Sequence, residues 1–263
     1  MQIHVNGIQL AYSDQGRGLP VVFVHAFPLS RAMWAPQLTP LSSRCRTITV
    51  DLRGHGESDA PLWCYTLDQF ADDLRALLDH LSLSQAVFVG LSMGGYILFA
   101  FYRRFRERVK ALVLADTRAQ ADTEEGRTGR FNLVQTASRE GVSAVADSMM
   151  PKLFSQATLQ GRPDLVRQAR DIIEANTLSG IASDLMAMAQ RPDSTTLLKE
   201  ITVPTLVIVG EQDVATPPSD ARLMADGIPG SRLVVIPGAG HLANLEQPEA
   251  FNLALMEFLE AVR

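Results

Sequence analysis

Four short segments of the chain are apolar at almost every position. They are residues 21–24, 86–89, 111–115 and 205–209. A strand with one solvated face alternates apolar and polar residues, whereas a strand covered on both faces does not. We therefore predict that these segments are central strands of a mostly parallel sheet.

Two further segments and the first residues of the chain extend this sheet. Residues 47–50 and 233–236 have the composition and length of strands. Apolar residues alternate with polar ones on both sides of Gly7, from Ile3 to Tyr12. This alternation predicts an antiparallel hairpin at the edge of the sheet.

Helical periodicity lies between the predicted strands. Residues 67–81 have apolar positions three and four apart, and Thr66 followed by Gln69 is typical of a capping box. A second helix is expected from just after Ser92 to about residue 106, and a last one from near Pro248. Strands that alternate with helices predict a doubly wound α/β fold.

The stretch from residue 118 to residue 200 has no convincing strand. Its pattern predicts four helices, at residues 127–140, 142–150, 163–176 and 180–189. We expect this block to be a helical cap, inserted between two strands and packed over one end of the sheet. The prediction is a core of residues 1–117 and 201–263 with a cap of residues 118–200.

Composition and charge exclude several classes of protein. The 263 residues are 46% hydrophobic and 20% charged, as in a globular domain. Twenty-four Lys and Arg against 29 Asp and Glu give a net charge of −5, and the densest basic stretch, residues 103–110, is typical of a solvated helix end. We therefore expect no nucleic-acid partner.

The cysteines and the apolar runs bear on the compartment. Cys45 and Cys64 have neither a disulfide framework nor metal-ligand spacing, so we expect free thiols and no metal site. The first residues lack a signal-peptide pattern, and no run is long enough to span a membrane. We expect a cytoplasmic protein with no membrane partner; the sequence leaves a homo-oligomer open.

The motif that carries the clearest chemistry is Gly90-Leu91-Ser92-Met93-Gly94. It follows a predicted strand and precedes a predicted helix, which is the context of a G-x-S-x-G nucleophile turn. The turn exposes the serine hydroxyl at a helix N-terminus, where developing negative charge is favoured. We predict that Ser92 is a catalytic nucleophile.

A serine hydroxyl needs a base, and the base needs a carboxylate to orient it. His241 follows the glycine-rich segment after the last predicted strand, on the side of the sheet where Ser92 is expected. Asp213 and Asp116 both follow strands. We favour Asp213, because it gives the Ser, Asp, His chain order of this turn type.

An oxyanion needs two backbone donors. One is expected from Met93, the residue after the nucleophile, and the other from Phe27 in the loop after residues 21–24, because Pro28 has no N–H. His25, in the same loop, is predicted to pin that loop rather than to catalyse.

These segments together resemble the α/β-hydrolase fold superfamily over essentially the whole chain, and within it the small carboxylesterases and the 3-oxoadipate enol-lactonases. The segments are 25–28, 51–58, 90–94, 210–213 and 240–249. The resemblance implies hydrolysis of small-molecule esters or lactones by this triad without a cofactor. One departure is His25-Ala26, where the oxyanion loop usually has His-Gly; the added methyl group is expected to narrow the acyl pocket.

The segment of residues 51–58 includes Arg53. We favour a structural role for Arg53 and keep recognition of a substrate carboxylate as the alternative. For the substrate pocket we predict lining by Trp34 and by two methionines of the cap, Met149 and Met186, because methionine adapts to irregular apolar walls. For Trp63, Phe131 and Phe154 the sequence is equally consistent with a place in the pocket wall and with a place in the hydrophobic core.

The prediction for function is a serine hydrolase of small carboxylic esters or lactones that forms an acyl-enzyme on Ser92. Two alternatives stay open. One is hydrolysis of carbon–carbon bonds in dienoate or diketo acids with the same triad. The other is a hydrolase fold that serves as a small-ligand receptor.

Overall fold

A computed structural model describes residues 1–62 and 64–263. Within these residues eight strands form one sheet, in the order β1-β2-β4-β3-β5-β6-β7-β8. The strands are β1 (Gln2–Val5), β2 (Ile8–Gln15), β3 (Pro20–Val24), β4 (Arg46–Val50), β5 (Ala86–Leu91), β6 (Val109–Ala115), β7 (Thr205–Gly210) and β8 (Arg232–Ile236). Strands β1 and β2 are antiparallel at the edge, and the others are parallel. The predicted α/β fold with an antiparallel edge hairpin is confirmed.

The central strands are buried on both faces, as their unbroken apolar runs predict. In the register of β3 with β5, Val22 lies opposite Phe88, and both side chains belong to one core cluster. The next pair, Val21 and Val87, belongs to the second cluster, on the other face of the sheet. Each face is therefore a separate hydrophobic core.

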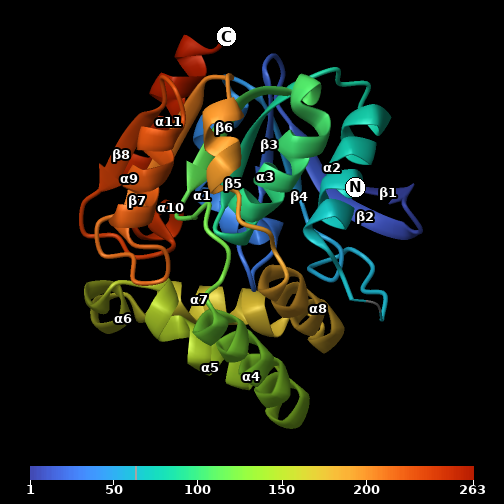
Figure 1. The fold of residues 1–263 in the computed structure, drawn as a ribbon, viewed down its shortest axis with the longest axis vertical. Helices are drawn as coiled ribbons and strands as arrows, with labels where there is room; N and C mark the ends of the chain where they lie inside the picture. The colour runs from blue at the N-terminus through green and yellow to red at the C-terminus, as the bar shows by residue number, and fades with distance from the viewer. Residues whose placement is uncertain (63) are drawn as a thin grey trace.

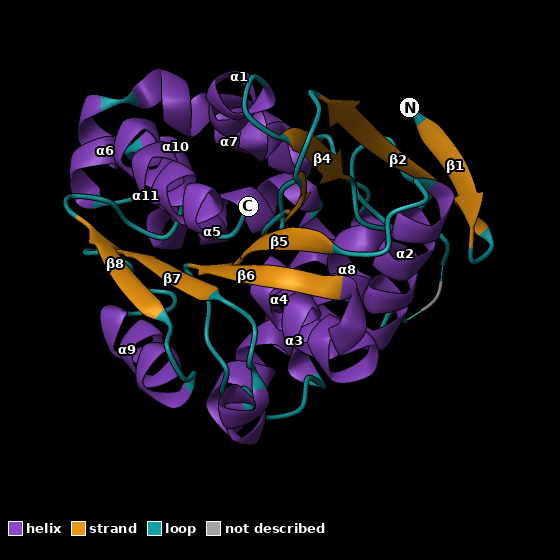
Figure 2. Ribbon diagram, turned by 90° about the horizontal axis from the view of Figure 1, so that it is seen from above, coloured by secondary structure: helices purple, strands orange, loops and turns teal. Residues whose placement is uncertain are grey.

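Helices cover both faces of this sheet. The helices of residues 35–105 and 218–261 are α1 (Ala35–Ser42), α2 (Leu67–His80), α3 (Met93–Phe105), α9 (Pro218–Gly227), α10 (Ala243–Glu246) and α11 (Pro248–Ala261). Helices α1 and α11 cover one face, and α2, α3 and α9 cover the other (Figure 2). The predicted capping box is present at α2: Thr66 Oγ1 accepts from the Gln69 N–H, and the Gln69 side chain accepts from the Thr66 N–H.

The residues between β6 and β7 are helical and lie together at one end of the sheet (Figure 1). The helices are α4 (Glu124–Glu140), α5 (Val142–Leu153), α6 (Gln156–Gly161), α7 (Pro163–Glu174) and α8 (Leu178–Ala189), with a 3₁₀ segment at Thr195–Glu200. Four of them match the predicted helices, and α6 was not predicted. The division into a core and a cap stays a prediction.

Helix α6 is only six residues long, too short for an apolar period to emerge from the sequence. It begins at Ser155, whose hydroxyl accepts from the Thr158 N–H. The two thiols are free, as expected; Cys45 is buried and Cys64 is exposed. The basic stretch at the end of α3 is used in surface ion pairs, such as Arg104 with Asp72 and Arg108 with Asp79.

Candidate active site

Ser92 lies between β5 and α3 in a strained backbone conformation, with φ 54° and ψ −113°. Such a conformation is costly for a residue with a side chain and is found mainly at functional sites. The neighbouring glycines permit it. A Cβ at Gly94 would overlap the Val24 carbonyl oxygen, and a Cβ at Gly90 would lie 2.6 Å from the Gly94 carbonyl carbon.

Hydrogen bonds from β6 and the residues after it fix this turn. The Ser92 N–H donates to the Ala115 carbonyl oxygen at 2.9 Å. The Thr117 hydroxyl donates to the Ser92 carbonyl oxygen at 2.7 Å. The backbone of Ser92 is therefore held on both its N–H and its C=O, which leaves the side chain to face the cavity described below.

His241 and Asp213 come from the loops that follow β8 and β7, and their side chains meet. His241 Nδ1 lies 2.8 Å from Asp213 Oδ2. Asp213 Oδ1 accepts from the N–H groups of Ala215 and Thr216 at 2.8 and 2.9 Å. Burial raises the pKa of the Asp213 carboxyl, but His241 and the bonds from Thr216 outweigh it, so this pKa lies below its ordinary value. An ionised Asp213 is suited to orient a protonated Nδ1.

Ser92 and His241 both line a cavity of about 570 Å³, within the size range of small-ligand sites. Apolar and polar side chains from the sheet loops and from the helices between β6 and β7 share its wall. The apolar lining residues are Phe27, Leu133, Met149, Leu185, Met188, Val214 and Ala215; the charged ones are Arg118, Asp122, Glu125, Arg130 and Lys152. The cavity opens onto the two groups that the sequence predicts as nucleophile and base.

Of the two predicted oxyanion donors, Phe27 lines this cavity, whereas Met93 follows Ser92 in the chain and is not among the lining residues. Met93 is the first residue of α3, and Phe27 is in the cavity wall. Neither N–H donates to another described residue. Both N–H groups are therefore unpaired among the described residues, although buried backbone donors are normally paired within a protein.

Of the three residues predicted to line the substrate pocket, one lines the cavity and two do not. Met149 lines the cavity, whereas Met186 does not and Met188, two residues along α8, does. Trp34 is fully buried in the core, with its ring 5.1 Å from that of Phe23, and it does not line this cavity.

Phe131 and Phe154, which the sequence predicts equally well as pocket or core residues, do not line the cavity either. Phe154 is in the core and Phe131 is 41% exposed. Trp63 lies outside the described residues. The aromatic rings that the sequence offers for the pocket are therefore replaced, in the described wall, by Phe27 and Tyr96.

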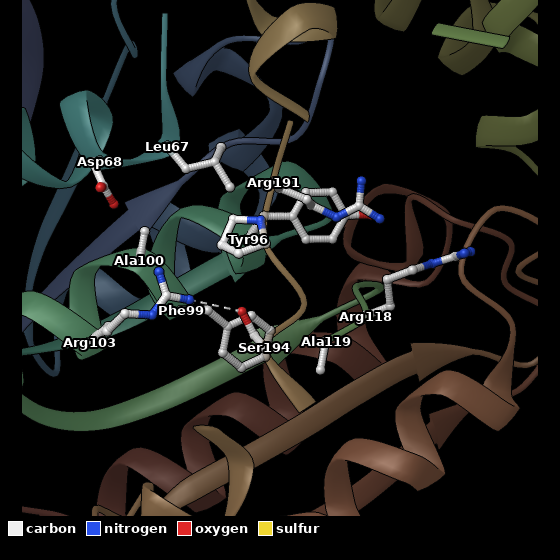
Figure 3. A pocket seen from close by; sticks show the side chains of 11 residues that line it. Leu67, Asp68, Tyr96, Phe99, Ala100, Arg103, Arg118, Ala119, Arg191 and Ser194 are labelled. Carbon is white, nitrogen blue, oxygen red and sulfur yellow. Dashed lines mark hydrogen bonds between the residues drawn. The ribbon is translucent and has the colours of Figure 1, made fainter. Parts of the chain in front are cut away.

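A second, much smaller pocket lies beside this cavity (Figure 3). Tyr96 and Arg118 line both. The Arg191 guanidinium lies 4.3 Å from the centre of the Tyr96 ring and is paired with Asp122 at 2.7 Å. With a volume of about 20 Å³ the pocket has room for a water molecule and not for an organic substrate.

Asp116, the other candidate acid, is fully buried, and its Oδ1 accepts from the Gly210 N–H at 2.7 Å. Burial, and secondarily the charge of Asp213, holds its pKa well above the ordinary value, so Asp116 is neutral where Asp213 is ionised. Of the two carboxyls, Asp213 is the one bonded to His241.

His25 pins its loop, as predicted. Its Nε2 accepts from the Leu52 N–H at 3.1 Å, and its Nδ1 lies 3.0 Å from the Ala26 carbonyl oxygen. Arg53 has the structural role that we favoured, because its guanidinium is buried and forms two 2.7 Å bonds with Asp73. It does not line the cavity.

Comparison with known proteins agrees with this geometry. The family described as the α/β hydrolase fold matches residues 20–248. The chain belongs to the α/β-hydrolase fold family.

Solved members of the α/β-hydrolase fold family include close matches. A thermophilic esterase from Thermogutta terrifontis, with malate bound, has a TM-score of 0.96 and 42% identity, covering 100% of this chain and 99% of that chain. The enol-lactonase from Burkholderia xenovorans LB400 has a TM-score of 0.93 and 32% identity, covering 99% and 100%. In sequence, 3-oxoadipate enol-lactonase 2 of Acinetobacter baylyi is 32% identical over 235 residues, which are 89% of this chain and 86% of that protein. The resemblance drawn from the motifs is confirmed.

Two buried polar residues that the sequence analysis did not identify lie beside this α/β-hydrolase site. Glu246 accepts from the Gly240 N–H, adjacent to His241, at 2.6 Å. Its other oxygen accepts from the N–H and the hydroxyl of Ser155 at 3.0 and 2.7 Å. Asn176 bonds to the loop that contains Phe27. Glu246 lies in the segment of residues 240–249, but no pattern there indicates its bonds to Ser155, and the partners of Asn176 in the core loops are far away in the sequence.

Among residues 1–62 and 64–263, no group of three or more His, Cys, Asp or Glu side chains is arranged to hold a metal ion. Within the same residues no helix combines the length and the apolar character that crossing a membrane requires.

Proposed function

We propose that this enzyme of the α/β-hydrolase superfamily is a serine hydrolase of small carboxylic esters or lactones. The observation that carries the proposal is the 2.8 Å contact of His241 Nδ1 with Asp213, in a cavity that His241 shares with Ser92. The strained turn at Ser92 supports the role of its hydroxyl as the nucleophile.

The proposed reaction proceeds through an acyl-enzyme. Ser92 Oγ attacks the substrate carbonyl carbon while His241 Nε2 takes the hydroxyl proton, and Asp213 stabilises the imidazolium. The N–H groups of Phe27 and Met93 bind the negative oxygen of the tetrahedral intermediate. His241 then protonates the leaving alkoxide, and the alcohol departs from the acyl-Ser92 ester.

Water completes the cycle. His241 takes a proton from a water molecule as its oxygen attacks the acyl carbon, and the second tetrahedral intermediate collapses with return of the proton to Ser92 Oγ. The products are a carboxylic acid and an alcohol. With a lactone the same steps open the ring and give one hydroxy acid; an enol-lactone gives a keto acid, because the released enol tautomerises.

Esters and lactones are proposed as substrates because proteins similar to this chain are named as an esterase and as enol-lactonases. The mixed lining of the cavity supports small substrates with both an apolar and a polar end. The test is hydrolysis of p-nitrophenyl esters from acetate to octanoate, with 3-oxoadipate enol-lactone as a further substrate. The chain-length optimum measures the acyl space.

Ser92→Ala is the decisive variant. We expect it to lower turnover by about 10⁴-fold or more, because the remaining binding groups cannot replace the nucleophile. Near wild-type turnover in a folded Ser92→Ala protein would remove the proposed mechanism. Turnover of dienoate or diketo acids in place of every ester and lactone would assign the triad to carbon–carbon bond hydrolysis.

A further inference from the structure

Asn176 connects the segment between α7 and α8 to two loops of the core. Its side chain is buried, with 6% exposure of the residue. Nδ2 donates to the Pro28 carbonyl oxygen at 2.8 Å, with the Leu29 oxygen at 3.4 Å and the Ile172 oxygen at 3.1 Å. Oδ1 accepts from the Gly56 N–H at 2.8 Å. The amide therefore uses its donors and its acceptor together.

The loop to which Asn176 donates its hydrogen bonds contains the Phe27 N–H. The carbonyl oxygen of Ala26 belongs to the same peptide unit as that N–H, and it accepts from the Leu29 N–H at 2.8 Å. His25 donates to it from Nδ1, because Nε2 is occupied as the acceptor of another N–H. Burial lowers the pKa of His25 to about 4, so the ring is neutral and has this single tautomer.

A peptide unit is planar, with its N–H and C=O pointing in opposite directions. Bonds that fix the Ala26 oxygen consequently fix the direction of the Phe27 N–H. These bonds do not fix the other side of the turn, where the carbonyl groups of Pro28 and Leu29 lie. Asn176 is the side chain that donates to both of these oxygens.

We propose that Asn176 is a positioning residue that holds the oxyanion loop in its productive geometry; this role rests on the proposed serine hydrolase function. Without its amide the Pro28 carbonyl loses its donor in a buried site, and such a group turns toward another partner or water. The turn would shift with it, and the Phe27 N–H would leave the place where the oxyanion forms. Small displacements of such donors are costly in rate.

The role predicts a specific kinetic signature. Asn176→Ala and Asn176→Asp both remove the amide donor, and Asp keeps the shape of the side chain and an acceptor for Gly56. We expect kcat on a p-nitrophenyl ester to fall about 10- to 100-fold, somewhat less than for removal of an oxyanion donor outright. KM should stay within about twofold, because the oxyanion exists only after the substrate has bound.

A tetrahedral adduct provides the second readout. An alkyl boronic acid forms such an adduct with a catalytic serine, and its Ki should rise by about the same factor as kcat falls. A residue that merely supports the fold would lower the thermal midpoint with kcat and Ki unchanged. Asn252→Ala is the matched control, because Asn252 is also buried and donates to a carbonyl oxygen, that of Pro36, in another part of the core.

These measurements distinguish failure of the role of Asn176 from failure of the proposed function. Unchanged kcat in either folded variant, or a fall in kcat without a change in the boronate Ki, would overturn the role of Asn176 and leave the proposed function intact. If Asn176→Ala does not fold, Asn176→Asp decides, since it creates no cavity. Failure of both to fold would also overturn the role, because Asn176 would then support the whole fold. Absence of Ser92-dependent turnover in the wild type would remove the proposed function and this role with it.

Discussion

Thr216 donates its hydroxyl, at 2.7 Å, to the same oxygen of Asp213 that faces His241. The hydroxyl oxygen also lies 3.3 Å from His241 Nδ1. Since Asp213 is ionised, its Oδ2 can accept from both groups, and this requires the His241 proton to be on Nδ1. Nε2 is then the acceptor nitrogen, as the proposed proton transfer from Ser92 demands. Thr216 therefore helps to select the tautomer that the proposed mechanism uses.

Thr216→Val tests this arrangement with little change in volume. We expect kcat/KM to fall about 10-fold, because a hydrogen bond to a charged group contributes about 1.5–3 kcal/mol. The pKa of Asp213 should rise toward its ordinary value. Because a lowered carboxyl pKa stabilises the fold above the unfolded pKa and the gain is lost as pH falls through the folded pKa, the variant should unfold in acid at a higher pH.

The measurements for Thr216→Val are pH–rate profiles and acid unfolding followed by circular dichroism. Thr202→Val, at an exposed position before β7, is the control. Equal acid midpoints for Thr216→Val and the wild type would contradict the expectation.

Glu246 should affect both stability and rate. Glu246→Ala leaves the N–H groups of Gly240 and Ser155 without their acceptor, so we expect a loss of about 3 kcal/mol in the free energy of unfolding. Since Gly240 is adjacent to His241, kcat should fall about 10-fold as well. Urea unfolding and ester hydrolysis measure the two effects. Glu249→Ala, three residues further along and exposed, should change neither; a Glu246→Ala protein that matches it would refute the link.

Gly180 should be intolerant of alanine although it lies in a helix. A Cβ there would overlap the Gly54 carbonyl oxygen, which is backbone and cannot rotate away. We expect Gly180→Ala to destabilise the protein by about 1–3 kcal/mol, since α8 must move off the loop. Gly129→Ala in α4 has open space, and it should stabilise by up to about 1 kcal/mol through helix propensity. Thermal unfolding of the pair decides, and shifts of the same sign would contradict the packing argument.

Asp184 of α8 should make stability fall as pH rises. It is fully buried, its oxygens accept no hydrogen bond from a described residue, and its Oδ2 lies 3.3 Å from His55 Nε2. Burial holds the pKa of Asp184 well above its ordinary value and lowers that of His55 to about 3, so both are neutral in the fold. Above about pH 4 Asp184 has lost its proton in the unfolded chain but keeps it in the fold, so this group favours unfolding by up to about 1.4 kcal/mol per pH unit until its folded pKa is reached. His55, which is charged in the unfolded chain and neutral in the fold, opposes this trend below about pH 6.5.

Asp184→Asn removes this penalty, because an amide supplies a donor to His55 at any pH. We expect the variant to gain stability relative to the wild type as pH rises from 5 to 9, measured by urea unfolding at each pH. A difference between the two proteins that does not change with pH would show that Asp184 is ionised in the folded protein.

Local patterns predicted the fold and the groups at the ends of strands. Unbroken apolar runs specify strands covered on both faces, and Ser92, Asp213 and His241 each follow a strand within a recognisable turn. Parallel strands place their carboxyl ends at one edge, so the meeting of Asp213 with His241 could be expected from order alone.

Contacts between distant segments could not be predicted in this way. Trp34 is in the core because the packing of Phe251, 217 positions away, closes over it at a ring distance of 6.3 Å. The rotation of α8 places Met188 rather than Met186 at the cavity, and apolar character alone does not specify that rotation. No sequence pattern indicates the bonds of Asn176 to Pro28 or of Glu246 to Ser155, because only the folded chain brings these partners near.

Helix α4 differs from its neighbours in how it is attached. It packs on α8 and α5, most of its residues are exposed, and its inner side supplies Gly126, Arg130 and Leu133 to the cavity wall. The loops that contain Phe27 and His241 are held elsewhere, by Asn176 and Glu246. Substitutions on the inner side of α4 therefore change the shape of the cavity wall and leave the loops of Ser92, Asp213 and His241 unaltered. This makes α4 the natural target for directed evolution of substrate preference.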